Sequence, residues 1–142
     1  SGTQGGVDEV SLTEIVIDLL PTDDASGRIL DNAQRSALLQ WQMRQRTYEM
    51  TQRRAMEEAK ARAPGFTSSA VKLTGTLLKQ ERDELHLSAL GFHGLYWESD
   101  DVSKDALKQT RTWLHQKSLT IAGGTAEVQR NIIAKRVLGL PD

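Results

Sequence analysis

The sequence predicts an all-α protein folded as an antiparallel helical bundle. Apolar residues recur at the three- and four-residue spacing of one helix face in successive segments. Capping residues, glycines and prolines mark where these segments begin and end. The segments are joined by short connections, which favour antiparallel neighbours in a bundle.

Size and composition exclude several classes of protein. A chain of 142 residues is large enough for one domain with a buried core. A net charge of −1 gives no global field that would draw the protein to nucleic acid. No apolar run approaches the roughly 20 residues of a membrane helix. The absence of cysteine excludes disulfides and thiolate metal sites and fits a reducing compartment, so we expect a cytoplasmic protein.

The bundle is expected to span residues 11–142, because residues 1–10 have the composition of a linker or of the cut end of a longer chain. Ser11 and Glu14 form a capping-box pattern that opens a first helix, and Pro21 closes it. The apolar content of this helix predicts that it is largely buried. Its apolar residues are Ile15, Val16, Ile17, Leu19 and Leu20.

A single long helix is predicted from Asp24 to Ala63. This segment contains no proline and one glycine, Gly27. Pro64 and Gly65 follow it and are expected to end the helix. At 1.5 Å per residue the helix would be about 55–60 Å long. It would exceed the next longest helix by several turns, so we expect another copy of the chain or missing domains to cover part of its face. The apolar positions are Ile29, Ala33, Ala37, Trp41, Tyr48, Ala55 and Ala59.

Three further segments complete the predicted bundle. Thr67 or Ser68 is expected to cap a helix that runs to Gly91, and a loop follows over residues 91–101. Ser103 then begins a helix that leads to a pair of glycines, Gly123 and Gly124.

The last helix follows directly after the glycine pair. Gly123 and Gly124 allow a turn, Thr125 can cap the helix, and Gly139 ends it with Pro141 just beyond. Its predicted apolar stripe consists of Ile132, Ile133, Val137 and Leu138.

Other side chains that bear useful chemistry form no convincing site. The basic residues of the long helix alternate with Glu49, Glu57 and Glu58 at helical spacing, which indicates a solvated face rather than a nucleic-acid surface. The histidines show no metal-ligand spacing, and the acidic loop lacks the enclosure that acid–base catalysis needs. The tryptophans are expected to anchor the core or an interface. These residues are His86, His93 and His115; Glu98, Asp100 and Asp101; and Trp41, Trp97 and Trp113.

The stretch SLTIAGGTAEVQRNIIAKRVLGLP, residues 118–141, closely resembles the C-terminal end of flavin-dependent acyl-CoA dehydrogenases. In that family, Gly-Gly-Thr, a small residue, Glu, an aliphatic residue and Gln-Arg-Asn precede a helix ending in Val-Leu-Gly-Leu-Pro. Residues 68–82 and 111–117 are similar to the family's earlier helices. The resemblance runs from about Asp24 to the C-terminus.

This resemblance implies that the chain is the C-terminal helical bundle of a larger enzyme, which also has a helical N-terminal domain and a central β domain. The family oxidises acyl-CoA thioesters to trans-2-enoyl-CoA. A glutamate removes the α proton, and FAD accepts the β hydrogen as hydride. By resemblance, Thr125 and Glu127 contact FAD, with the turn of Gly123 and Gly124 close to it. The plain alternative is that Thr125 is a helix cap and Glu127 complements the helix dipole.

Two departures from the family pattern limit the catalytic expectation. Many members carry the catalytic glutamate immediately before the Gly-Thr pair, and this chain has Gly123 there. The family's Arg-Phe-Gly motif at the entry to the long helix is also missing. The chain is therefore expected to lack a catalytic residue, to be inactive alone, and to work with the rest of a parent chain or an unlike subunit in an oligomer. The alternative is a non-catalytic helical interaction subunit that kept the fold.

Overall fold

The computed structural model describes residues 11–62, 67–122 and 124–141. They contain five α-helices, which confirms the all-α prediction. Short 3₁₀ turns follow α3 and α4, at Gly91–Leu95 and Lys117–Thr120, and a π turn, Ile133–Val137, extends α5. The α-helices are α1 (Leu12–Leu19), α2 (Asn32–Lys60), α3 (Thr67–Leu90), α4 (Lys104–Gln116) and α5 (Ala126–Ile132).

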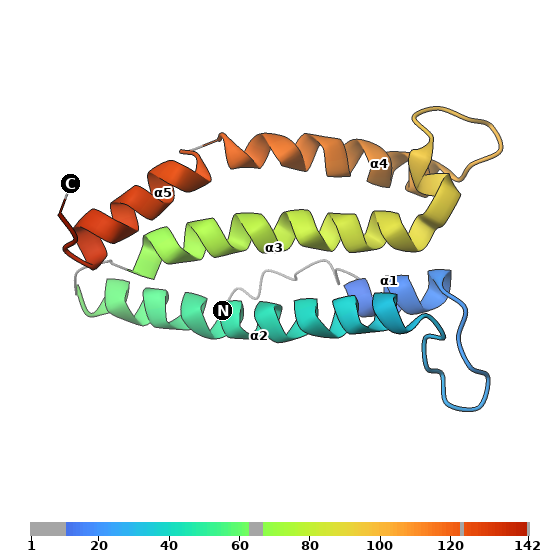
Figure 1. The fold of residues 1–142 in the computed structure, drawn as a ribbon, viewed down its shortest axis with the longest axis horizontal. Coiled ribbons are helices and arrows are strands. Elements are labelled where there is room, and N and C mark those ends of the chain that lie inside the picture. The colour runs from blue at the N-terminus through green and yellow to red at the C-terminus, as the bar shows by residue number, and fades with distance from the viewer. Residues whose placement is uncertain (1–10, 63–66, 123, 142) are drawn as a thin grey trace, which may run out of the picture.

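Helix α3 lies in the middle of the bundle (Figure 1). Helix α2 runs antiparallel to it on one side, and α4 and α5 return along the other side. Helix α1 lies beside the first half of α2 and packs on α3. The glycine turn between α4 and α5 consequently lies at the same end of the bundle as the beginning of α3.

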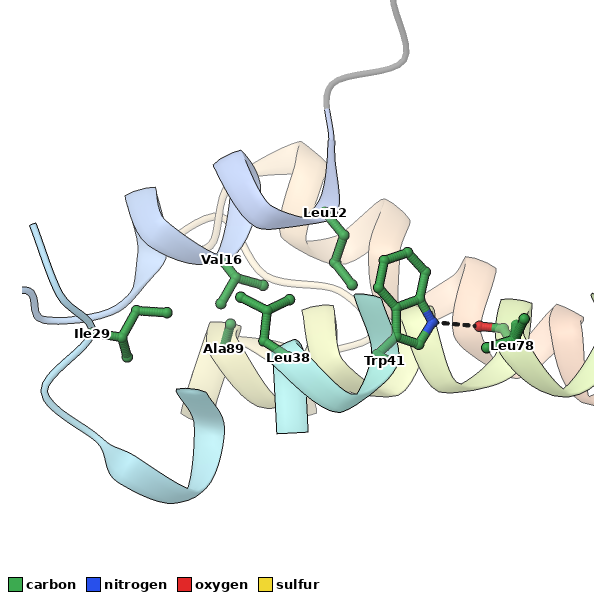
Figure 2. Packing of buried hydrophobic residues seen from close by; sticks show 7 residues of the cluster. All are labelled: Leu12, Val16, Ile29, Leu38, Trp41, Leu78 and Ala89. Atoms are coloured by element: carbon green, nitrogen blue, oxygen red, sulfur yellow. Dashed lines mark hydrogen bonds between the residues drawn. The ribbon is translucent and has the colours of Figure 1, made fainter. Parts of the chain in front are cut away.

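The buried core lies where α1, α2 and α3 meet (Figure 2). Trp41 of α2 is its largest side chain, and its indole Nε1 donates a hydrogen bond to the Leu78 carbonyl of α3 at 3.0 Å. Apolar burial drives this packing, and the hydrogen bond fixes how the two helices sit against each other. The core residues are Leu12, Val16, Ile29, Leu38, Trp41, Leu78 and Ala89.

The long helix begins at Asn32, so the prediction that it starts at Asp24 is wrong. Residues 21–30 instead form an ordered loop in which Thr22 and Ile29 pair as an isolated β-bridge. The Asp23 carboxylate accepts hydrogen bonds from the backbone N–H and the hydroxyl of Ser26. These local bonds give the backbone an alternative to helix. Asp31 is the true cap, accepting from the Gln34 N–H at 2.9 Å.

The revised boundary changes the argument about helix length. Helix α2 has 29 residues, or about 44 Å at 1.5 Å per residue. Helix α3 has 24 residues, so the length difference is smaller than predicted. The large uncovered surface of α2 has another cause: α2 rests mainly on α3, and only Leu38 and Trp41 among its residues are buried.

Two other local predictions are corrected. Helix α1 is not largely buried, because Leu12 and Val16 face α3 while Ile17 and Leu19 remain 40% exposed. Thr67 is the first residue of α3 rather than its cap. Pro64 and Gly65, predicted to end the long helix, lie outside the described residues.

An apolar stripe on α2 faces away from the rest of the bundle. Leu39, Met43 and Met50 have exposed fractions of 52%, 71% and 65%. Their spacings of four and seven residues place them on one face of the helix. Exposed apolar side chains that form a row, rather than scattered single residues, are typical of surfaces covered by another polypeptide.

Candidate functional site

The turn before α5 contains most of the predicted site residues. Gly124 has φ +100°, a backbone conformation that favours glycine. Thr125 is the N-cap of α5, as predicted, and its hydroxyl accepts a hydrogen bond from the Val128 N–H at 3.3 Å. Gly123, also predicted to belong to this site, lies outside the described residues.

Helix α3 contacts the turn through the side chain of Lys72. The Lys72 ammonium donates a hydrogen bond to the Gly124 carbonyl at 2.8 Å, although 52 residues separate them in the sequence. Gln129, buried with 8% exposure, lies under the turn. A Cβ atom on Gly124 would lie 3.1 Å from its Nε2. Lys72 and Gln129 were missed as site residues, since the family resemblance includes them but assigns them no role.

The contact between the turn and α3 is closely packed. Only about 20 Å³ of space remains between Lys72, Leu77, Leu119, Gly124 and Gln129. That volume admits about one water molecule. The space between the turn and α3 is therefore too small for a cofactor.

Glu127 lies in the first turn of α5. Hydrogen bonds from its own backbone N–H and from the Thr125 hydroxyl hold the pKa of the Glu127 carboxyl below its ordinary value, with a smaller contribution from Arg130. Arg130 Nη1 lies 3.8 Å from Glu127 Oε1. The helix start therefore already has a carboxylate to complement its dipole. This arrangement does not leave the open anion site that a diphosphate would require.

The other side chains considered from sequence are dispersed. Trp41 is in the core and Trp113 is half-buried, whereas Trp97 is 54% exposed and anchors no core. Arg111 of α4 covers the Trp97 ring at 5.2 Å and lies 3.7 Å from Glu98. No group of three or more metal-binding side chains occurs among the described residues. No described helix is long and apolar enough to cross a membrane.

The described helices and the glycine turn define an all-α helical bundle domain, and sequence comparison assigns it to a family. The family described as "Acyl-CoA dehydrogenase, C-terminal domain" matches residues 10–138. The chain belongs to this family.

One similar protein is "Acyl-CoA dehydrogenase IpdE1" of Mycolicibacterium smegmatis (strain ATCC 700084 / mc(2)155), which is 40% identical over 62 residues. The match covers 44% of this chain and 15% of that relative. No solved structure matches.

Proposed function

We propose that this chain is the C-terminal helical domain of an FAD-dependent acyl-CoA dehydrogenase and that it closes the flavin site and forms a subunit interface. The family match over residues 10–138 is the observation that carries this proposal. The parent enzyme would desaturate acyl-CoA thioesters between the α and β carbons. The chain alone would be inactive, because one turn offers few of the contacts that a dinucleotide needs.

The turn suits one part of the cofactor better than another. FAD, when bound, supplies the hydride acceptor of the reaction. The Thr125 hydroxyl and the Glu127 carboxylate can exchange hydrogen bonds with an uncharged portion of FAD, while Glu127 would repel its diphosphate. The compact contact between Gly124 and α3 leaves the outer side of the turn as the approach. We therefore assign the flavin contact to Gly123, Gly124, Thr125 and Glu127, through neutral groups of the cofactor.

The interface role rests on α2. The stripe of Leu39, Met43 and Met50 needs a cover that the described helices do not provide. The cover would be another part of the parent chain, a second copy, or an unlike subunit. Arg46 beside the stripe pairs with Glu49 of the same helix at 3.2 Å, so the apolar side chains are the surface that a partner would contact.

The cofactor contact is tested in the complete enzyme. Thr125→Ala and Glu127→Ala should each lower the amount of FAD that remains bound after gel filtration. Ser103→Ala is the matched control, because Ser103 caps α4 through the Ala106 N–H but lies outside the turn. Flavin retention that is the same in all three variants would remove Thr125 and Glu127 from the cofactor site.

The source of the catalytic base needs a separate experiment. Gly123 has no side chain to accept a proton, so an active parent enzyme must take its base from an upstream helix or from a partner subunit. Upstream carboxylates replaced one at a time should identify one whose loss abolishes turnover. This outcome would support the enzymatic assignment.

The same absence of a glutamate at Gly123 favours a second candidate, a non-catalytic helical subunit that stabilises an active partner. For that subunit, no carboxylate of its own chain would matter to turnover. Gly123→Glu would create activity only if the rest of the site had been retained. The two candidates are therefore separated by turnover measured on the same series of variants.

A further inference from the structure

We propose that Lys72 is a positioning residue that fixes the orientation of the Gly124–Thr125 peptide and thereby presents Thr125 to the cofactor. This inference rests on the proposed flavin contact of the turn. It assigns a role to a side chain on a different helix, 52 residues before Gly124.

The hydrogen bond from Lys72 sets the direction of a whole peptide group. Its ammonium donates to the Gly124 carbonyl oxygen at 2.8 Å, a distance typical of a charge-assisted hydrogen bond. A trans peptide is planar, and its C=O and N–H point in opposite directions. Because Lys72 draws the Gly124 carbonyl toward α3, the Thr125 N–H of the same peptide faces away from α3.

The direction of this peptide decides what the outer side of the turn offers. The Thr125 N–H is a donor, whereas a flipped peptide would turn the Gly124 carbonyl, an acceptor, toward the cofactor. A flip of this peptide would rotate ψ of Gly124, and glycine restricts ψ little because it has no Cβ atom. Glycine alone therefore does not select one orientation, and the ammonium supplies the selection.

Packing around the turn supports the same orientation without replacing the hydrogen bond. The buried Gln129 lies against Gly124 from below, and Val128 Cγ1 would lie 3.4 Å from a Cβ atom at this position. The remaining space of about 20 Å³ is too small for another side chain to move in. Loss of the ammonium would therefore leave the Gly124 carbonyl facing α3 with its charged donor gone, which favours reorientation of the peptide.

The first test uses the 142-residue chain and nuclear magnetic resonance. Lys72→Met retains a long side chain but removes the donor. Lys79→Met is the matched control, because Lys79 is an exposed residue of the same helix on the side of α1. Lys72→Met should shift the resonances of the Gly124 carbonyl carbon and of the Thr125 amide. It should also speed the exchange of the turn's amide protons with solvent. Lys79→Met should leave them unchanged, and Lys72→Arg should largely restore the native spectrum.

Global stability is measured on the same samples by circular dichroism. If Lys72→Met loses helicity, Lys72→Gln takes its place, since glutamine is polar but cannot supply an ammonium. Turn resonances in a folded Lys72 variant that match those of Lys79→Met would overturn the proposal.

The second test measures FAD affinity in the complete enzyme. Lys72→Met should raise the FAD dissociation constant by about tenfold, at the lower end of the effects seen for residues that orient a metal ligand. Lys79→Met should not change it. If Thr125→Ala weakens FAD binding and Lys72→Met does not, the positioning role is wrong. If Thr125→Ala has no effect, the proposed flavin contact fails, and the resonance experiment still decides the role of Lys72 in the turn.

Discussion

Trp41 and Leu78 join the two longest helices by a buried hydrogen bond between a side chain and the main chain. The indole Nε1 of Trp41 in α2 donates to the Leu78 carbonyl in α3 at 3.0 Å. The two residues expose 9% and 4% of their surface. The bond fixes the rotation of α2 on α3, and that rotation leaves Leu39, Met43 and Met50 on the outer face.

Trp41→Phe should destabilise the protein by about 2 kcal/mol, because it removes this hydrogen bond and leaves a small cavity. Trp113→Phe is the control, since the buried Trp113 Nε1 has no hydrogen-bond partner among the described residues. Losing an unsatisfied donor offsets the lost ring volume, so we expect a cost below about 1 kcal/mol. Urea denaturation measures both, and equal losses would show that the hydrogen bond has no special weight.

Gly75→Ala should destabilise the α2–α3 contact. A methyl group at Gly75 would collide with the Tyr48 hydroxyl and lie 2.8 Å from Tyr48 Cζ. Overpacking of this kind costs about 1–3 kcal/mol, more than the roughly 1 kcal/mol that alanine gains over glycine in a helix.

The sign of the Gly75→Ala effect should reverse when Tyr48 is also truncated to alanine. Without the Tyr48 ring the methyl group at position 75 meets no clash, so the higher helix propensity of alanine should stabilise the protein. A destabilising effect of the same size in both backgrounds would contradict the steric explanation.

Acidification should weaken the protein through His86. Burial lowers the pKa of His86 below its ordinary value of 6.5, and Arg82 lowers it further, while Asp83 opposes the change. The folded state therefore favours the neutral ring. The contribution of His86 to stability is complete above pH about 6.5 and is lost as the pH falls through the lowered folded-state pKa.

This effect is measured by urea midpoints at about pH 7.5 and about pH 5.5. His86→Gln should lose less stability between the two values than the native protein. The exposed His93 serves as the control, and His93→Gln should retain the native pH dependence. If His86→Gln loses as much stability between the two pH values as the native protein does, other groups cause the acid sensitivity.

The isolated chain should self-associate through the α2 stripe. Light scattering at micromolar concentration should show a mass that rises with concentration, and Met43→Glu with Met50→Glu should abolish the rise. Met56→Glu is the control, because Met56 is 62% exposed but lies on another face of α2. A native chain that remains monomeric at all concentrations would contradict the prediction.

Helix starts were predictable where a local signal determined them. Ser11, Ser103 and Thr125 each cap the helix assigned to them, since a cap requires only residues within one turn. The start of α2 was misplaced because Ile29 has helical spacing but lies in the loop held by Asp23 and Ser26. Periodicity identifies a face and does not recognise a competing turn.

The site was only partly predictable for a similar reason. The family resemblance located the Thr125 turn, and the cap geometry followed from the sequence. The hydrogen bond from Lys72 to Gly124 depends on how α3 and α5 pack, which no local pattern encodes. The position of Trp97 depends on packing as well. This residue was predicted to anchor the core or an interface, and its ring lies at the surface beneath Arg111, so it does not anchor the core, while the interface role stays a prediction.

The central position of α3 has a consequence for the order of folding. Helices α1, α2, α4 and α5 each pack on α3, so none of them is secured before α3 is helical. Helix α3 is therefore expected to belong to the folding nucleus, and its amide protons to exchange with solvent only through global unfolding. Helix α2 shares the buried core through Leu38 and Trp41, so its release from α3 would expose that core and should accompany global unfolding.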